Sequence, residues 1–341
     1  MTDNAGTQHP GLELLHAEMT RQCADALATL DSAQDAAAEI VASLRRTGRL
    51  VLYAMGGSQH VNRIVEPLYR EAGIEARSMI ASEALMAPLP GKDARTAVIV
   101  SQSGESGEII GLLERPAGAE ERFGLTLEGG STLARGVRRA IVAAGGTERA
   151  FAATRSIVLT LAMHAAVLEA LGIPQAELRK LLAANEPADV TAMDAALADC
   201  DVFVFAGRHV MQGAAESAAL SLMELARVPA IGFEGGQFRH GPFEFLRPGL
   251  GIVLLRSAGP DKDEVRQLAE GPVDAGCKVV VLDASGEESF PGALHVRLAA
   301  GSGLAAAASA LLTLQRFNIL VAQRRIEAGI GTPLRTSKVT V

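Results

Sequence analysis

The feature that most constrains the fold is an alternation of short apolar runs with helical segments, written twice along the chain. The first set of runs covers residues 49–55, 96–100 and 123–127. The second set covers residues 201–206, 251–255 and 278–282, about 150 residues further on. Apolar runs of this length that alternate with helices are typical of strands buried on both faces of a parallel sheet. The predicted fold class is therefore α/β, with doubly wound parallel sheets that carry helices on both faces.

The repetition also predicts two domains. Residues 1–186 would form an N-terminal helical segment plus the first α/β unit, residues 187–330 the second unit, and residues 331–341 a C-terminal tail. The seam is expected in the polar stretch NEPAD, residues 185–189. A chain of 341 residues with 48% hydrophobic content is long enough to bury a core in each unit. Residues 12–44 are helical by pattern, and we expect them to pack on the first unit or on a neighbouring subunit.

The net charge of −7 argues against nucleic acid as a partner, because binding a phosphate backbone depends on clustered Lys and Arg. A small anion remains compatible with this charge. The three cysteines, Cys23, Cys200 and Cys277, have no C-x-x-C spacing and are interpreted as reduced packing residues. The polar N-terminus lacks the pattern of a secretory signal, so a cytoplasmic location is expected.

Two long apolar stretches require a test for membrane spans. Residues 156–173 and 296–321 are rich in alanine, but polar or charged side chains interrupt both of them. The hydrocarbon core of a bilayer tolerates such interruptions poorly. We therefore interpret both as buried or interface helices and expect no membrane partner.

A serine-rich turn follows one of the predicted strands, in the sequence TAVIVSQSGESGEII of residues 96–110. Ser101, Gln102, Ser103 and Ser106 lie between the strand and the helix that follows it. Backbone N–H groups and the positive end of a helix dipole bind anions at such a turn, and hydroxyls add donors without adding charge. The simpler alternative is that the serines only cap the helix. The chain has neither a G-x-x-x-x-G-K-[ST] loop nor a G-x-G-x-x-G after a strand, so nucleotide hydrolysis and dinucleotide binding are disfavoured.

A second small-residue turn favours the ligand-binding interpretation. Gly57 and Ser58 follow the first predicted strand in the same way, so two strand ends would offer donors to one place. Thr154 and Arg155, in the segment FAATRS ahead of a helix, are a third candidate contribution. A sugar phosphate fits this set of donors better than an isolated helix cap does.

With these residues assembled, the chain resembles the sugar isomerase (SIS) family over nearly its whole length. The likeness is greatest to the tandem-SIS isomerase half of glucosamine-6-phosphate synthase and its relatives. It is carried by Gly57-Ser58, Ala81-Ser82-Glu83, the run Ser101 to Ser106, Gly146-Thr147-Glu148, Thr154-Arg155, Gly207-Arg208, the helix with Glu224, Arg239-His240-Gly241-Pro242 and Lys338-Val339-Thr340. Each motif alone is weak, whereas their order and spacing together are specific.

The resemblance implies a two-SIS, flavodoxin-like fold and a hexose 6-phosphate substrate, with no cofactor and no metal. It implies that the phosphate is bound by Ser58, Ser101, Gln102, Ser103 and Ser106. Gly57 and Thr154, from the turns described above, complete the set of predicted substrate-binding or phosphate-binding residues. It further implies that Glu224 moves a proton between C1 and C2, that His240 helps to open the sugar ring, and that Lys338 on the tail closes over the substrate. In the family this histidine enters the site of the partner subunit, so a homodimer is expected.

The chemistry of these residues can be assessed without the family. Glu224 lies in ALSLMELARV, an otherwise apolar helix, and a carboxylate in a dry pocket is a suitable base for a proton alpha to a carbonyl. The alternative is a solvent-facing helix glutamate.

His240, in FRHGPFEF, can pass a proton near neutral pH, although a lone histidine is more often structural. Lys338 is close to the chain end, where a lysine is usually just solvated. The remaining histidines, such as His164, show no metal-ligand spacing.

The chain departs from the synthases in two ways, and both bear on the expected activity. Where the synthases carry lysines and another glutamate on the Glu224 helix, this chain has Ser217, Ser221 and Met223, with Glu216 displaced by one residue. The chain also begins without a glutaminase domain and its nucleophilic cysteine, so it is not expected to draw ammonia from glutamine. The expected activity is a glucosamine-6-phosphate deaminase/isomerase type. The alternatives are a ketose/aldose phosphate isomerase, a fructosamine-phosphate deglycase, and a non-catalytic sugar-phosphate-binding regulator.

Overall fold

The computed structural model describes residues 10–260, 262–299 and 301–330. Its first half is an α/β unit preceded by two helices. The strands of this half are β1 (Arg49–Ala54), β2 (Glu75–Ile80), β3 (Arg95–Val100), β4 (Glu120–Thr126) and β5 (Arg139–Val142). The helices are α1 (Pro10–Ser32), α2 (Gln34–Thr47), α3 (Gly56–Glu71), α4 (Ala81–Met86), α5 (Gly107–Glu114), α6 (Thr132–Gly136), α7 (Arg155–Ala170) and α8 (Ala176–Ala184).

The second half repeats this plan after a linker in which Asn185 ends α8 in the left-handed conformation, with φ 49°. Its strands are β6 (Val202–Gly207), β7 (Ala230–Glu234), β8 (Leu250–Arg256), β9 (Lys278–Asp283) and β10 (Leu294–Arg297). Its helices are α9 (Thr191–Ala196), α10 (Val210–Ala226), α11 (Gly235–Arg239), the 3₁₀ turn η1 (Pro242–Phe245), α12 (Glu264–Asp274), α13 (Gly303–Arg325) and the π-helical turn η2 (Ile326–Ile330).

Each half contains one five-stranded sheet whose strands are all parallel. The strand orders are β2-β1-β3-β4-β5 and β10-β9-β8-β6-β7. In the first sheet the chain moves from β1 to one side for β2 and to the other side for β3, so the connection reverses between β1 and β3. The second sheet reverses in the same way between β6 and β8. The predicted α/β class with parallel sheets is therefore confirmed.

Both faces of each sheet are covered. In β1 and β3, Val51, Tyr53, Ala97 and Ile99 pack with α4, α5 and α6, whereas the alternating residues pack on the opposite face with α1, α2, α3 and α7. The same period of two divides the second sheet between α11 and α12 on one face and α10 and α13 on the other. Strands that alternate between two buried faces become apolar throughout, which is the pattern seen in the sequence.

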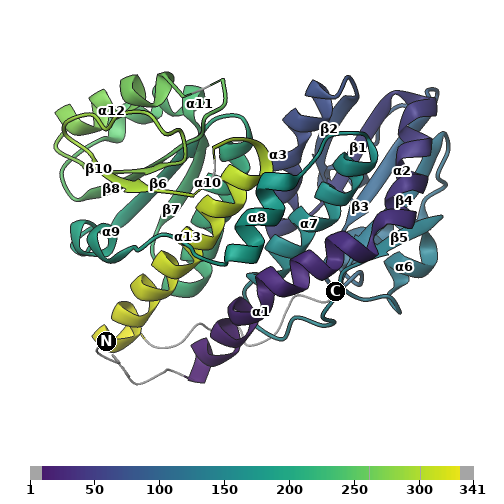
Figure 1. The fold of residues 1–341 in the computed structure, drawn as a ribbon, viewed down its shortest axis with the longest axis horizontal. Coiled ribbons are helices and arrows are strands. Elements are labelled where there is room, and N and C mark those ends of the chain that lie inside the picture. Colours follow the sequence, from purple (N-terminus) through teal and green to yellow (C-terminus); the bar gives the residue numbers. More distant parts are fainter. Residues whose placement is uncertain (1–9, 261, 300, 331–341) are drawn as a thin grey trace.

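The inner faces of the two sheets contribute to one continuous core. A single cluster of buried side chains extends from Leu12 in α1 through α7, α10 and α13 to Ile326. Figure 1 shows the two halves as separate lobes, with α3, α8, α10 and α13 lying between them. The two halves of the sequence are thus joined by helix packing as well as by the linker.

Helix α13 continues into η2, and within the described residues Gly303–Gly329 is the one helix apolar and long enough to cross a membrane. Its apolar window is 89% buried inside the protein, as expected for a core helix. The other apolar stretch became α7, where His164 is fully buried and its Nδ1 lies 3.1 Å from the Tyr69 hydroxyl. Burial lowers the pKa of His164 to about 3, so this histidine is a neutral packing residue.

The three cysteines agree with their predicted role. Cys23, Cys200 and Cys277 are all free and buried. Burial raises the pKa of Cys23 and of Cys200 to about 11, which keeps both as unreactive thiols.

Helices α3 and α10 pack backbone to backbone at Gly213. A Cβ atom on Gly213 would lie 2.3 Å from the His60 carbonyl oxygen and 2.7 Å from the Ile64 amide nitrogen. We expect Gly213→Ala to force the two helices apart and to lower the free energy of unfolding by about 1–3 kcal/mol, measured by urea denaturation. Gly130→Ala is the control, because a Cβ there meets nothing within 4 Å. Equal stability of the two variants would contradict this packing.

Candidate active site

The two turns predicted to bind an anion meet at the reversal point of the first sheet. Strands β1 and β3 are hydrogen-bonded neighbours, with Leu50 in register with Thr96 and Tyr53 with Ile99. The turn that begins α3 and the turn between β3 and α5 therefore leave the sheet side by side. Such a reversal point is where doubly wound sheets bind ligands.

The serine turn is held in shape by its own hydroxyls. The Gly104 N–H donates to Ser101 Oγ at 3.1 Å, and the Glu105 N–H donates to Ser103 Oγ at 3.2 Å. Ser106 occupies the N-cap position of α5, but its side chain makes no capping hydrogen bond to that helix. A hydroxyl that accepts through its oxygen keeps its proton for another acceptor. Ser101, Ser103 and Ser106 can therefore all donate to an anion at the N-terminus of α5.

Gly104 and Glu105, within the serine turn, hold this turn against the start of α6. Gly104 has φ 66°, and a Cβ atom on it would lie 2.3 Å from Ser131 Oγ, so only glycine fits this position. The Glu105 carboxylate accepts the Thr132 N–H at 2.6 Å, and this hydrogen bond lowers the pKa of Glu105. Glu105 is therefore occupied as a cap of α6, which leaves the serines as the ligand-facing groups of the turn.

Gly57 and Ser58 lie in the first turn of α3, against the start of α7. A Cβ atom on Gly57 would lie 2.7 Å from Ile157 Cδ1 and 3.7 Å from the Ala153 Cβ. This close approach requires a glycine and brings the N-termini of α3 and α7 together. Ser58 is half-buried in that first turn, which follows β1 at the same edge of the sheet where β3 ends.

The third predicted contribution, Thr154 and Arg155, is corrected by the structure. Thr154 is 1% exposed, and its N–H donates to Glu148 Oε1 at 3.0 Å while its hydroxyl faces the same oxygen at 3.5 Å. The Ser156 N–H and hydroxyl also donate to Glu148, at 3.0 and 2.6 Å. Glu148 thus acts as the cap of α7, and the Thr154 hydroxyl faces this carboxylate instead of the predicted phosphate.

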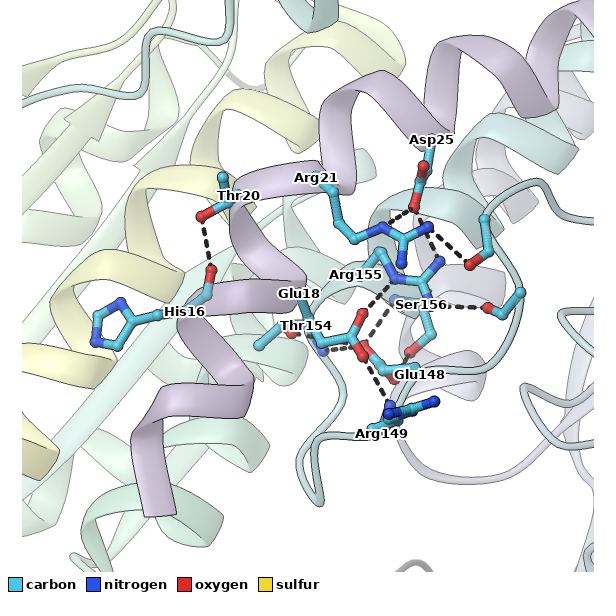
Figure 2. A network of polar contacts seen from close by, with 12 residues as sticks. His16, Glu18, Thr20, Arg21, Asp25, Glu148, Arg149, Thr154, Arg155 and Ser156 are labelled. Carbon is cyan, nitrogen blue, oxygen red and sulfur yellow. Dashed lines mark hydrogen bonds and ion pairs between the residues drawn. The ribbon is translucent and has the colours of Figure 1, made fainter. Parts of the chain in front are cut away.

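Arg155 faces Glu18 and Asp25 of α1 (Figure 2). Its guanidinium is fully buried, with Nε 2.5 Å from Glu18 Oε2, Nη1 3.1 Å from Asp25 Oδ2 and Nη2 donating to the Gly146 carbonyl at 2.7 Å. Its predicted role as an anion donor is therefore wrong, because all of this charge is used inside the protein. The sequence carried one signal that was missed: Glu18 and Asp25 are seven residues apart, on one face of a helix.

Glu224 extends a polar stripe along α10 toward the two turns. Ser217, Ser221 and Glu224 are spaced i, i+4 and i+7 and therefore share one face of the helix. Ser217 and Ser221 line a narrow cavity together with Ile157, the residue that contacts Gly57. Glu224 itself is exposed in this single chain. The other faces of α10 are buried, so within one chain the carboxylate lies at the surface, and a dry pocket around it stays a prediction.

His240 is carried by a different face of the second sheet. It follows α11, whose Phe238 packs in the outer core with β6, β8 and α12, whereas α10 packs on the inner face. His240 is exposed and lines a cavity of about 300 Å³ with Arg208, Arg239 and Glu264. One chain thus does not bring His240 onto the polar stripe of Glu224. Lys338 and the predicted tail lie outside the described residues.

Arg208, on the wall of the His240 cavity, is paired with two carboxylates. Arg208 forms an ion pair with Glu234 at 3.0 Å and a second one with Glu264. Glu234 also accepts the Gln237 N–H at 2.8 Å and so caps α11. Among the described residues no group of three or more His, Cys, Asp and Glu side chains could hold a metal ion.

Comparison with known proteins gives a consistent set of relatives. The chain is 24% identical over 300 residues to a glutamine–fructose-6-phosphate aminotransferase (isomerizing) from Methanothermobacter thermautotrophicus, covering 85% of this chain and 50% of the relative. The relative from Thermus thermophilus with the same name is 28% identical over 221 residues, which is 59% of this chain and 37% of the relative. The chain thus spans about half the length, or less, of the curated relatives it matches. No protein-family model matches the chain.

Solved structures share the fold over nearly the whole chain. The C-terminal domain of glucosamine-fructose-6-phosphate aminotransferase from Francisella tularensis superposes with TM-score 0.82 at 18% identity, covering 95% of this chain and 98% of that one. Tagatose-6-phosphate ketose/aldose isomerase from Escherichia coli has TM-score 0.78 at 19% identity, with 96% of each chain covered. Glucosamine-6-phosphate deaminase from Thermotoga maritima has TM-score 0.66 at 18% identity, covering 92% and 100%. The chain therefore shares its fold with these three solved structures.

The buried guanidinium generates a stability prediction. We expect Arg155→Met to lower the free energy of unfolding by about 3–5 kcal/mol, because it leaves the Glu18 carboxylate buried without its charge partner. Urea denaturation measures this loss. Arg21→Met is the matched control: Arg21 pairs with the same Asp25 at 2.8 Å, but its side chain is 47% exposed, and it should cost less than about 1 kcal/mol. Similar losses in both variants would contradict the role assigned to Arg155.

Proposed function

We propose that the chain is a phosphosugar isomerase acting on an amino-hexose 6-phosphate, of the glucosamine-6-phosphate deaminase/isomerase type. The observation that carries the proposal is the meeting of two donor-rich turns, at Gly57-Ser58 and at Ser101 to Ser106, beside the polar stripe that ends in Glu224. The first half would bind the phosphate and the second half would supply the base. The names of the related proteins support a sugar phosphate as the ligand.

The proposed phosphate contacts use neutral donors. The hydroxyls of Ser58, Ser101, Ser103 and Ser106, the Gln102 side chain and the backbone N–H groups at the starts of α3 and α5 would surround the phosphate oxygens. Gly57 would permit the close approach. The helix dipoles add positive potential without a lysine.

The proposed chemistry is a proton transfer between neighbouring carbons of the open-chain sugar. The Glu224 carboxylate would remove the proton at C2 and return it to C1, while the C1 oxygen gains a proton and the amine nitrogen loses one, so that the aldehyde becomes an alcohol and the amine an imine at C2. Water then hydrolyses the imine to the ketose and ammonia. With a hydroxyl in place of the amine, the same transfer interconverts aldose and ketose, so a ketose/aldose isomerase or a deglycase would need the same base.

His240 and Lys338 complete the proposal. His240 would enter the site from a second copy of the chain and assist ring opening, since one chain holds it on the opposite face of the second sheet from α10. Lys338 would close over the substrate from the tail. Both roles, the homodimer and a cytoplasmic location are part of the proposal.

The first test concerns Glu224. Proton NMR in deuterated water, with glucosamine, galactosamine, fructose and glucose 6-phosphates, should reveal solvent deuterium at C1 or C2 of one sugar. Glu224→Gln should slow this exchange at least about 100-fold, because it removes the base, while the sugar phosphate still raises the melting temperature. Glu216→Gln, on the same helix and near Arg63 at 3.9 Å, is the control and should retain exchange.

Two results would overturn parts of this assignment. Full exchange in Glu224→Gln would exclude Glu224 as the base. Tight binding of a sugar phosphate by the unmodified chain, without exchange of any proton, would identify a sugar-phosphate-binding regulator instead of an enzyme.

The second test concerns the shared site. Glu224→Gln and His240→Asn should each be inactive alone, whereas unfolding and refolding them together should restore activity. Random pairing of the two chains gives one intact site in half of the dimers, so about a quarter of the unmodified activity is expected. Absence of recovery, with dimers present by light scattering, would mean that each chain uses its own His240.

A further inference from the structure

A narrow cavity with an unusual polar wall lies between α7, α10 and α13. The start of α7 contributes Ile157, α10 contributes Ser217 and Ser221, and α13 contributes Gln315 and Asn318. Its free volume is about 10 Å³, which is room for one water-sized group. The two amide side chains are buried, with Gln315 7% and Asn318 0% exposed.

The orientation of both amides is set by backbone carbonyls. The Gln315 Nε2 donates to the Thr154 carbonyl at 3.0 Å, and the Asn318 Nδ2 donates to the Ala218 carbonyl at 3.0 Å. Carbonyl oxygens accept and do not donate, so the nitrogens must face them and the amide oxygens must face elsewhere. Gln315 Oε1 and Asn318 Oδ1 are both buried without a hydrogen-bond partner in the described chain, and so is Ser221 Oγ. Three oxygens that can accept a hydrogen bond are therefore unpaired around one small space.

This space lies between the two parts of the proposed active site. Ile157, on its wall, contacts the start of α3 at Gly57, where the phosphate is proposed to bind. Ser221, on the opposite wall, is one helical turn before Glu224 on the same face of α10. A sugar whose phosphate lies at the two turns and whose reacting carbons lie at Glu224 would pass this cavity with a substituent beside those carbons.

The three unpaired oxygens around the cavity favour one kind of sugar substituent, a group that donates several hydrogen bonds. Buried acceptors without partners are unfavourable, and a group that donates to all of them removes that cost. An ammonium group donates three hydrogen bonds, one for each of the three oxygens, whereas a sugar hydroxyl donates one. The nearby Glu224 carboxylate also favours a positive charge over a neutral group.

We propose that Ser221, Gln315 and Asn318 form a specificity pocket that binds the amino group at C2 of the sugar phosphate. This inference rests on the proposed function, because it assumes that a sugar phosphate occupies the adjoining turns. It explains why α10 carries serines on this face: a lysine at the position of Ser217 or Ser221 would place a second cation where the amino group binds. The pocket would distinguish amino sugars from the corresponding hydroxy sugars.

The test uses two open-chain probes that cannot isomerise and that differ in one group. These are 2-amino-2-deoxyglucitol 6-phosphate and glucitol 6-phosphate, with inorganic phosphate as a third ligand for the turns alone. Calorimetry should give at least about tenfold tighter binding of the amino probe to the unmodified chain, since two of the three acceptors stay unpaired with the hydroxyl probe. Ser221→Ala should reduce this preference several-fold and leave the affinity for phosphate unchanged.

Two control variants separate the pocket from general packing. Ser221→Thr keeps the hydroxyl and should keep the preference. Ser309→Ala removes another buried serine, on α13 but outside the cavity wall, and should also keep it. Melting temperatures without ligand verify that each variant is folded.

The outcomes distinguish this inference from the function on which it rests. Equal binding of the two polyol phosphates, or an unchanged preference in Ser221→Ala, would overturn the pocket while the sugar-phosphate function stands. If neither polyol phosphate binds, the proposed function fails and the pocket fails with it.

Discussion

The interaction on which the rest of the site depends is the burial of the Arg155 guanidinium between Glu18 and Asp25 of α1. A charge buried away from water is costly unless it is paired. The folded chain therefore requires α1, which carries both carboxylates, to pack against the start of α7. The Arg155 guanidinium also donates to the Gly146 carbonyl, and Glu148, in the same loop as Gly146, caps α7. The start of α7 in turn limits how closely α3 approaches, at Gly57. The position of the Gly57-Ser58 turn thus depends on α7, although α7 provides none of the proposed donors.

The second half is attached to this frame through polar contacts as well as through the shared core. Gln315 on α13 donates to the Thr154 carbonyl beside Arg155, and Asn318 donates to α10 at Ala218. Because α10 also contacts α3 backbone to backbone at Gly213, the stripe that ends in Glu224 is held at a fixed distance from the start of α3. The proposed phosphate donors and the proposed base therefore come from different halves of the chain, and the helices between the lobes position them relative to each other.

The sequence predicted the inner strands of both sheets and missed the outer ones, for a physical reason. β1, β3, β4, β6, β8 and β9 lie inside their sheets and read as apolar runs. The four strands that were not predicted, β2, β5, β7 and β10, are the four sheet edges. An edge strand has less buried surface, so it keeps charged residues such as Arg77 in β2 and Arg297 in β10, and its apolar run is broken.

The sequence by itself determined the α/β class, the parallel inner strands and the hydroxyl-rich turns after β1 and β3, because these depend on the period of apolar residues and on neighbours along the chain. It could not determine where long side chains point. Arg155 was predicted to face an anion and instead pairs with Glu18, 137 residues away, and Thr154 faces Glu148. Only the tertiary structure decided that Glu224 is exposed within one chain and that His240 lies on the other face of the second sheet. It also decided that two amides lining one cavity keep buried oxygens without a partner among the described residues. These outcomes are settled by desolvation and pairing between segments far apart in sequence, for which a single sequence carries no local signal.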